Sequence, residues 1–427
     1  MDVVALGELL IDFTENGVSG QGNPLFEANP GGAPCNVLAM LSRLGHRTAF
    51  IGKVGNDFFG KQLEDAITEV GIDAAGLLKD DKVHTTLALV HTYPDGDRDF
   101  SFYRNPGADM MLTEEELPEE IIHGAKIFHF GTLSMTHPGV RAATKKAIAV
   151  AKEAGAIISF DPNIRKPLWD SMEDAREQVL YGLGQCDILK ISDNEIQWLT
   201  GKEDYTDGVR WIRERYPVPL ILVSMGKEGS RAYYKDRIVE AKPFLQPNTI
   251  ETTGAGDTFC ACVLHYVLEH GLEGLEEKDL KEMLRFANAA ASLITTRKGA
   301  LRVMPEKEEI EKMKRYGRIY TIMLIVTVVS AVPLFMWLGV WAFIPWGIIW
   351  AISMYFVLKI EKVKKDNDVQ SYKEIVAFSE GKLLDDIQKQ CEIGKRPYQK
   401  NLLVIGSMLI TLAVCVLIGF LMHVFLN

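Results

Sequence analysis

Short apolar runs alternate with helical patterns from residue 1 to about residue 314, and this alternation restricts the fold more than any other feature of the chain. The runs that resemble strands span residues 3–9, 49–54, 126–130, 157–160, 188–191 and 220–223. Helical spacing of apolar residues covers 36–44, 61–70, 140–153 and 174–181. Strands that alternate with helices usually pair in parallel beneath those helices, so the pattern predicts an α/β fold with a mostly parallel sheet covered on both faces.

Two further runs interrupt this alternation. Residues 86–93 and 99–104 flank a Pro-Asp-Gly-Asp turn at 94–97, which is typical of a β-hairpin. We expect this hairpin to project from the main sheet, where it can serve as a lid.

A glycine-rich turn precedes a helix near the end of this part. Residues 251–259 read Glu-Thr-Thr-Gly-Ala-Gly-Asp-Thr-Phe, and apolar residues at helical spacing follow as far as Gly271. Gly254 and Gly256 allow backbone conformations in which successive N–H groups converge on an anion, and the start of a helix adds partial positive charge. Asp257 would then lie beside a phosphate and accept the proton of an attacking hydroxyl. An ordinary N-terminal cap is the alternative.

A second candidate phosphate motif fails on its chemistry. Residues 55–61 fit the first positions of a P-loop, but Gln62 stands where a Ser or Thr should bind Mg²⁺. We interpret residues 52–60 as a structured turn around Asp57.

Charge and cysteine usage exclude other classes. The formal net charge of −10 argues against a nucleic-acid partner. The cysteines are scattered, without a C-x-x-C pair or zinc-type spacing, and we expect reduced, mostly buried thiols. They are Cys35, Cys186, Cys260, Cys262, Cys391 and Cys415.

The composition changes abruptly after about residue 314. Segments 319–341, 343–359 and 402–425 are nearly free of charge and long enough, or almost so, to cross a bilayer. We therefore predict a membrane domain of residues 315–427 with three transmembrane helices, a multi-pass membrane location and a lipid bilayer as partner; buried core helices are the alternative. Basic residues before the first span and in the loop 360–401 place that loop and the soluble part on the cytoplasmic side.

Several motifs occur in a fixed order in residues 1–314. They lie at 7–12, 30–36, 52–60, 102–109, 160–165, 190–195, 224–229 and 253–257. Together they resemble the motifs of the PfkB (ribokinase-like) sugar kinases, and among these the bacterial fructokinases. The resemblance implies a ribokinase-like three-layer α/β/α sandwich with a small β-hairpin lid, which makes residues 1–314 a kinase domain.

The resemblance also implies a sugar site. Asp12, Gly31, Gly32 and Asn36 match positions that hold sugar hydroxyls, and a carboxylate with an amide suits accepting from and donating to such groups. Gly31 and Gly32 could instead form a simple entry turn to a helix.

Three more residues match substrate contacts of the family. Tyr103 and Arg104 fall at the end of the predicted hairpin, where the lid closes over the sugar. Arg104 could also be a solvated charge at the end of a strand. Arg165 resembles the residue that reaches the sugar or the moving phosphate.

On the nucleotide side, the matching positions lie mostly at strand ends, where α/β folds bind ligands. They are Ser192, Ser224, Gly226, Lys227, Gly229 and Asn288. Asn288 could equally be an ordinary polar residue of an alanine-rich helix. Glu195 matches the glutamate of an Asn-x-x-Glu motif that influences Mg²⁺, although Ser192 occupies the asparagine position. A monovalent cation such as K⁺ beside the 254–257 turn is common in the family.

The resemblance implies transfer of the γ-phosphoryl group of Mg·ATP to a primary hydroxyl of a ketose, with fructose 6-phosphate as the expected product. Asp257 is the expected base, and Gly254, Ala255 and Gly256 supply the anion hole. A 2-keto-3-deoxygluconate kinase is the nearest alternative, and a membrane-anchored sensor or scaffold that only binds sugar is another. A homodimer through the lid and a membrane transporter are possible partners.

Overall fold

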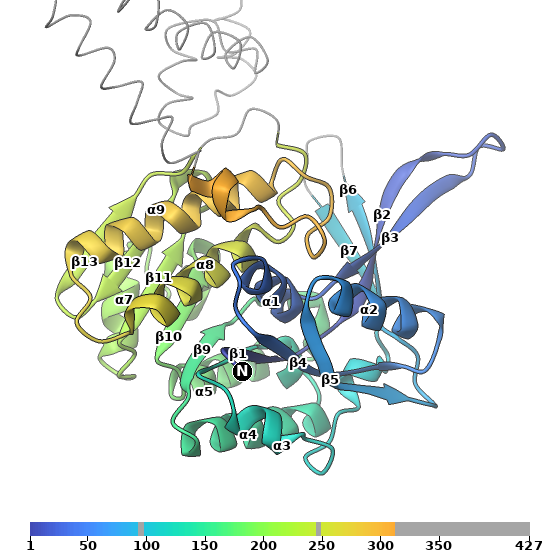
Figure 1. Cartoon of the computed structure of the whole chain (residues 1–427), viewed down its shortest axis with the longest axis horizontal. Coiled ribbons are helices and arrows are strands. Elements are labelled where there is room, and N and C mark those ends of the chain that lie inside the picture. The colour runs from blue at the N-terminus through green and yellow to red at the C-terminus, as the bar shows by residue number, and fades with distance from the viewer. Residues whose placement is uncertain (93–97, 245–248, 312–427) are drawn as a thin grey trace, which may run out of the picture. The chain divides into compact units, whose positions relative to one another are not determined.

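A nine-stranded sheet forms the centre of the fold, in a computed structural model that describes residues 1–92, 98–244 and 249–311. The strand order is β13-β12-β11-β10-β9-β8-β1-β4-β5 (Figure 1). From β11 along this order to β5, neighbouring strands pair in parallel. The strands β12 and β13 add antiparallel pairs at one edge. The strands are β1 Val3–Leu6, β4 Thr48–Gly55, β5 Ile72–Asp80, β8 Ile127–Gly131, β9 Ile157–Asp161, β10 Ile188–Ser192, β11 Leu220–Ser224, β12 Ser230–Tyr234 and β13 Arg237–Ala241.

Helices cover both faces of this sheet (Figure 1), as the alternation of strands and helices predicts. The helices α4 to α7 share one core with every second residue of the strands. On the other face α1 packs against β1 and β4, α8 packs between α1 and α9, and α9 lies against β12 and β13. The helices are α1 Ala33–Arg43, α2 Phe58–Glu69, α3 Glu119–His123, α4 Pro138–Glu153, α5 Met172–Leu183, α6 Asp193–Thr200, α7 Tyr205–Arg213, α8 Ala255–His270 and α9 Glu277–Ile294.

The lid is larger than the predicted hairpin. Strands β6 Leu87–Thr92 and β7 Arg98–Tyr103 pair antiparallel, which confirms the hairpin, and its turn at 93–97 lies outside the described residues. They belong to a four-stranded sheet with β2 Leu10–Val18 and β3 Pro24–Gly31, in the order β3-β2-β6-β7. The predicted strand 3–9 therefore splits, because the chain leaves the main sheet after β1 and enters the lid as β2 (Figure 1).

The pleat of the sheet determines which polar side chains face α8. Successive side chains of a strand point to opposite faces. In β9 and β10, Phe160 and Ile191 point into the core shared with α4 to α7. Asp161 and Lys190 consequently point to the face covered by α8, and both side chains are buried there. This face of the sheet carries the charges from which a site can be built.

The turn at 52–60 is structural, as predicted. Asp57 caps α2: its carboxylate accepts the N–H of Gly60 at 2.8 Å and the N–H of Thr85 at 2.9 Å. The capping bond stabilises the first turn of the helix. The P-loop interpretation is therefore unnecessary here.

The predicted membrane domain of residues 315–427 lies outside the described residues, as do its spans 319–341, 343–359 and 402–425 and its loop 360–401. Among the residues that are described, we find no helix with the length and apolar character needed to cross a membrane. Cys391 and Cys415 also lie outside this part. The other four cysteines are free and buried, as expected.

Candidate active site

The first turn of α8 has the left-handed start that the glycine pattern predicts. Gly254, the residue before the helix, has φ 74°, and its carbonyl accepts the N–H of Thr258 at 2.8 Å. The N–H of Ala255 donates to the carbonyl of Thr252 at 3.2 Å. In the described part of the chain, no hydrogen bond occupies the N–H groups of Gly256 and Asp257. Two of the predicted donors therefore remain for an anion, and the partial charge of the helix start supports them.

Asp257 is held by a residue of the predicted sugar site. The side chain of Asn36, on α1, donates from Nδ2 to Oδ2 of Asp257 at 2.8 Å. Burial raises the pKa of Asp257, whereas Asn36, Lys190 and Arg165 oppose the rise. The Oδ1 atom of Asn36 is buried and has no partner within the described residues. Such an orphaned acceptor fits a ligand hydroxyl, because a buried polar atom left unpaired is costly.

A buried ion pair lies under this turn, and sequence reasoning did not select it. Lys190 donates from Nζ to Oδ2 of Asp161 at 2.9 Å, and both residues are less than 10% exposed, at 6% and 3%. A Cβ atom on Gly256 would lie 3.1 Å from that Nζ. Burial alone would lower the pKa of Lys190, but the carboxylates of Asp161, Glu195 and Asp257 raise it well above its usual value. The charged lysine in an apolar strand was the available signal.

Two pockets adjoin the turn. The larger pocket has a volume of about 310 Å³ and is lined by Ser192 and Glu195, which are predicted to bind nucleotide or metal. Arg165 and Lys190 also line it. The smaller, of about 30 Å³, has a different set of lining residues. They are Asp12, Thr14, Asn29, Pro30, Gly31, Asn36, Val90, Glu251, Thr253, Gly299 and Ala300. The turn is thus linked to the first pocket through Lys190 and to the second through Asn36.

A side chain at either glycine of the predicted sugar site would meet a close neighbour, which is the carboxylate of Asp12 at Gly31 and the backbone of Glu8 at Gly32. A Cβ atom on Gly31 would come 2.2 Å from Oδ2 of Asp12, and one on Gly32 would come 2.4 Å from the carbonyl of Glu8. Gly32 also has φ 131° and precedes α1, so it forms the entry turn of the helix as well. The two interpretations of this pair are therefore compatible.

The structure places the two lid residues apart from the smaller pocket. Tyr103 ends β7 and is 63% exposed. Arg104 is buried: it pairs with Asp109 at 2.7 Å and donates to Thr136 Oγ1 at 2.8 Å and to the carbonyl of Leu133 at 3.0 Å. It is not the solvated charge that was the alternative. Its visible contacts stabilise the base of the lid, and its contact with sugar stays a prediction.

Glu195 is committed to the local fold. Its Oε2 accepts the N–H and the hydroxyl of Ser192 at 2.9 and 2.7 Å, and its Oε1 accepts the N–H of Ile164 at 2.8 Å. Ser192 caps α6 and forms a capping box with Glu195. The serine at the asparagine position therefore has a structural role, and both carboxylate oxygens of Glu195 are occupied. An indirect influence of Glu195 on a metal ion stays a prediction.

The loop after β11 has the strained backbone expected of its glycines. Ser224 ends the strand, and Gly226 begins a short 3-10 helix with φ 52°. Lys227 is exposed. Gly229 has φ 102°, and a Cβ atom there would lie 2.3 Å from the carbonyl of Ala241. Gly229 thus allows this loop to lie close to the end of β13.

Asn288 connects α9 to the edge of the sheet. Its Nδ2 donates to the carbonyls of Ala241 at 3.0 Å and Lys242 at 3.2 Å, and its Oδ1 accepts the hydroxyl of Ser230 at 2.9 Å. Asn288 is 7% exposed. It is therefore a structural residue of the helix rather than an ordinary polar one, and a contact with adenine stays a prediction.

Comparison with known proteins identifies the family of this chain. The model of the "pfkB family carbohydrate kinase" matches residues 1–307. The chain belongs to the pfkB family of carbohydrate kinases. This kinase is 43% identical to "Probable fructokinase-2" of Arabidopsis thaliana over 305 residues, which are 71% of this chain and 92% of that protein. It is 42% identical to "Fructokinase-1" of Zea mays over 310 residues, 72% of this chain and 96% of that protein.

Solved structures of similar kinases share the fold. A fructokinase from Xylella fastidiosa with bound ATP has a TM-score of 0.68 and 29% identity, and the match covers 74% of this chain and 99% of that one. A fructokinase double mutant from Vibrio cholerae O395, bound to fructose, ADP and potassium ion, has a TM-score of 0.66 and 28% identity, with 73% and 98% coverage. The ribokinase-like fold of this kinase is thereby established.

These findings correct the predicted multi-pass membrane location. The two plant relatives are matched over 92% and 96% of their own lengths by alignments of 305 and 310 residues, so they consist almost entirely of the kinase part. The described residues contain no helix that could cross a membrane. Neither these comparisons nor the described residues support a bilayer or a transporter as partner.

Proposed function

We propose that this kinase transfers the γ-phosphoryl group of ATP to a primary hydroxyl of fructose and forms fructose 6-phosphate. The observation that carries the proposal is the position of Asp257, at the start of α8 and linked to both pockets. The fructokinases of Arabidopsis thaliana and Zea mays, at 43% and 42% identity, support fructose as the acceptor.

Asp257 is the proposed base. As the oxygen of the sugar hydroxyl forms its bond to the γ-phosphorus, Asp257 takes the hydroxyl proton, and the bond from phosphorus to the bridging oxygen breaks to release ADP. A raised pKa suits a carboxylate that has to accept a proton during the reaction. Asn36 supports this role, because its bond at 2.8 Å fixes one carboxylate oxygen and leaves the other for substrate.

The moving phosphoryl group would be stabilised from two sides. The N–H groups of Gly256 and Asp257 would donate to its oxygens, with Gly254 and Ala255 shaping the turn. Lys190 supplies a positive charge from below, and Arg165, exposed in the larger pocket, faces the same region. Fixed donors and cations of this kind stabilise charge that develops in the transition state.

Asp12, Gly31 and Asn36 would hold the sugar, since they line the smaller pocket. Its volume of about 30 Å³ is well below the roughly 300–1,000 Å³ of typical ligand sites. The four-stranded lid would therefore have to move to admit fructose. Tyr103, at the end of β7, would follow that motion, whereas Gly32 and Arg104 lie at the base of the lid. A lid that closes again excludes water from the transfer.

ATP would bind in the larger pocket and along the loop after β11, where Ser192, Ser224, Gly226, Lys227 and Gly229 lie, with Asn288 behind the loop. The Oδ1 atom of Asp161 is buried without a partner in the described part of the chain, and it fits the water shell of a divalent ion. Asp161 and Glu195 would hold Mg²⁺ through water, and the ion would neutralise phosphate charge. Binding of K⁺ is supported by the Vibrio cholerae fructokinase in its potassium-bound form, and we propose that the ion lies beside the 254–257 turn.

The alternative acceptor, 2-keto-3-deoxygluconate, would need an additional cation for its carboxylate. Arg104 does not offer one, because it is buried against Asp109, so Arg165 would have to supply it. The sensor without turnover is disfavoured by the retained Asp257 and its two N–H donors.

The domain boundary near residue 314 remains a proposal. It is supported by the family match, which ends at residue 307, and by a compact unit that ends at Ile310.

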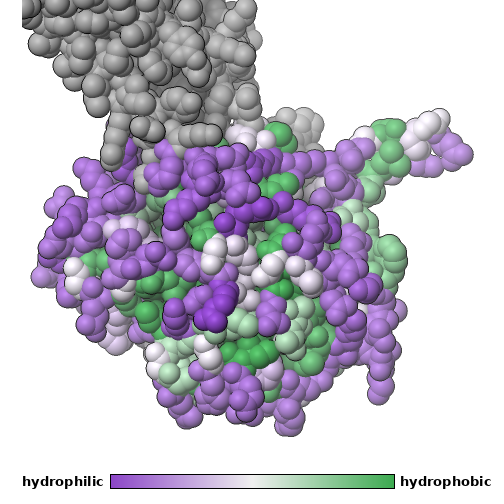
Figure 2. Space-filling view, viewed as in Figure 1, coloured by the Kyte–Doolittle hydropathy of each residue, from purple (hydrophilic) through white to green (hydrophobic). Residues whose placement is uncertain are grey.

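A homodimer through the lid is supported by apolar side chains on the β2–β3 arm (Figure 2), where Val18, Leu25 and Phe26 are 67%, 47% and 41% exposed. Sedimentation of the full chain at several concentrations tests it, and a single monomeric species would exclude it.

The full chain can be tested for ADP release with Mg·ATP and fructose, 2-keto-3-deoxygluconate or ribose. We expect the highest kcat/KM with fructose. Asp257→Asn should lower kcat by roughly 10²- to 10⁴-fold, the contribution usual for a general base. Asp65→Asn, an exposed carboxylate of α2, is the matched control and should leave the rate unchanged.

Each failure has a separate meaning. Turnover of none of the three sugars would favour the binding-only protein. A higher kcat/KM with 2-keto-3-deoxygluconate would replace the substrate but keep the site. An Asp257→Asn variant with full rate would show that the base is another residue.

A further inference from the structure

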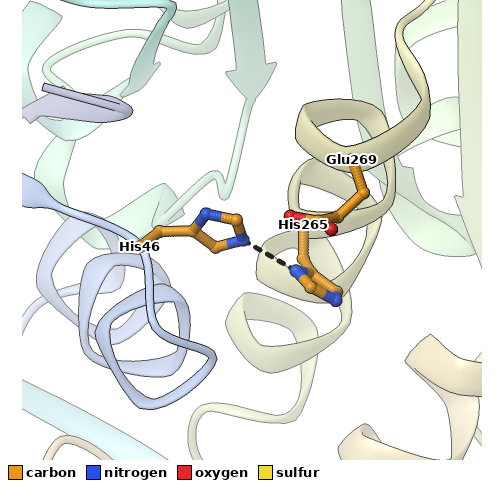
Figure 3. Close-up of side chains that lie close together, drawn as sticks. All are labelled: His46, His265 and Glu269. Carbon is orange, nitrogen blue, oxygen red and sulfur yellow. Dashed lines mark hydrogen bonds between the residues drawn. The ribbon is translucent and has the colours of Figure 1, made fainter.

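Two imidazoles and a carboxylate meet near the C-terminal end of α8, away from its first turn. His46 lies between α1 and β4, whereas His265 and Glu269 are one turn apart on α8 (Figure 3). The Nε2 atom of His46 is 2.7 Å from Nδ1 of His265. One ligand atom from each of the three residues lies within 4.8 Å of the others. The proposed phosphoryl transfer uses none of these groups.

We propose that His46, His265 and Glu269 form a binding site for a transition-metal dication of the zinc type. Two neutral imidazoles and one carboxylate are a common ligand set for Zn²⁺, and the remaining position would be taken by water. The i, i+4 spacing places His265 and Glu269 on one face of α8. With metal–nitrogen distances of about 2.0–2.1 Å, the two ring nitrogens would have to separate by less than about 1 Å.

The surroundings keep both imidazoles in the neutral form that binds metal. Burial lowers the pKa of His46, and burial together with the neighbouring imidazole lowers the pKa of His265 to about 4. The negative charge of Asp2 favours a positive charge at His46, and that of Glu269 favours one at both rings. These carboxylates would therefore partly balance the charge of a bound metal cation. Lys307 opposes a positive charge at both rings. Proton release is therefore not required for a metal ion to replace the present hydrogen bond.

The position of the site gives it a structural consequence. The helices α1 and α8 are already linked at one end by Asn36 and Asp257. His265 follows Asp257 by eight residues on α8, which is about 12 Å along the helix. His46 follows the end of α1. A metal ion would join α8 to the residues that follow α1. This second link would stabilise the alignment of Asn36 with Asp257 without touching substrate.

Co²⁺ titration of the full, chelator-treated chain tests the site, with excess Mg²⁺ present to occupy the proposed nucleotide site. We expect saturable binding of one equivalent, visible absorption of low-coordinate Co²⁺ without a thiolate band, displacement by Zn²⁺, and a rise in the thermal midpoint. His265→Gln and the exposed Glu269→Gln should each weaken binding at least about tenfold, since even outer-shell changes cost that much. Both variants should lose the midpoint rise.

His270→Gln is the matched control, because His270 is on the same helix but stacks on Tyr266 and bonds to its carbonyl at 3.1 Å. It should bind Co²⁺ like the unchanged chain. The proposal would be overturned if the chain showed no saturable Co²⁺ binding. It would also be overturned if Glu269→Gln and His46→Gln both bound Co²⁺ with the affinity of the unchanged chain, because the imidazoles would then form only a hydrogen bond. Because this readout is metal binding rather than turnover, the result is independent of the proposed kinase chemistry.

Discussion

The pair of Lys190 and Asp161 puts a persistent positive charge under the turn that carries the proposed base. The ammonium group of Lys190 is held in place because it is buried. It keeps its proton because the surrounding carboxylates raise its pKa. Gly256 matters for the same reason, since any side chain there would separate the charge from the turn. A fixed cation that is already desolvated requires little reorganisation when phosphoryl charge develops.

We expect Lys190→Met to lower kcat by roughly 10²- to 10³-fold and to change the KM for fructose little, because the cation would act on the transition state rather than on the sugar. Steady-state ADP release measures this. Lys152→Met, at an exposed lysine of α4 that donates to Gln185, serves as the control.

The variant also leaves Asp161 buried without its partner, which costs about 3–5 kcal/mol of stability in comparable cases. Adding Asp161→Asn should restore much of the thermal midpoint but not the rate. If the rate returned with the midpoint, Lys190 would be needed only to balance Asp161.

At the scale of elements, one buried amide adds hydrogen bonds to the packing of α9 on the sheet edge. Asn288 joins α9 to β12 and to the end of β13 with three hydrogen bonds. Asn288→Ala should lower the free energy of unfolding by about 2–3 kcal/mol, because the groups left behind are buried. It should also raise the KM for ATP, since the loop after β11 rests on this contact.

Urea unfolding of the full chain and steady-state kinetics check both effects. Lys281→Ala, at an exposed position of the same helix, should change stability by no more than about 0.5 kcal/mol. Unchanged unfolding in Asn288→Ala would contradict the structural role of this amide.

The sequence predicts well those strands of the main sheet that helices cover on both faces. The parallel strands β4, β8, β9, β10 and β11 lie within about one residue of the expected runs, because strands covered on both sides are continuously apolar. The lid strands β2 and β3 escaped this reasoning. From Asp12 onward β2 is only partly buried or exposed, so its composition lacks the apolar run of a central strand.

The candidate site divides in the same way. Asp257 and Asn36 were predicted and are bonded to each other. Arg104 and Asn288 matched family positions, but a matching position does not reveal that Asp109, five residues after Arg104, and Ser230, far from Asn288 in the sequence, hold these side chains. Lys190 was missed because a lysine inside a motif does not disclose which face of its strand it occupies.

For the whole molecule, buried histidines make stability depend on pH. The folded pKa values of His265, about 4, and of His46 lie below the ordinary 6.5. Between these values the unfolded chain binds more protons, so stability is lost as pH falls from about 6.5 towards 4. The facing groups are Asp2 and Glu269, which favour the charged form, and Lys126, Lys307 and His270, which oppose it.

His129, whose pKa is lowered to about 3 by burial and by Lys190, contributes in the same range. The test is therefore the difference between the unchanged chain and His265→Gln in thermal midpoint from pH 7.5 to 5. We expect a shallower pH slope in the variant. Equal slopes would mean that the imidazole pair is not a source of the acid sensitivity.

The short link between β1 and β2 constrains how such a kinase can change over time. Only residues 7–9 separate the central strand β1, which ends at Leu6, from the lid strand β2, which begins at Leu10 and carries Asp12. A one-residue insertion or deletion there that slipped the register of β2 would turn Asp12 to the other face of its strand, because side chains alternate. New acceptor preferences should therefore arise through substitutions at constant length in this link, and length variation should accumulate at the far tip between β2 and β3.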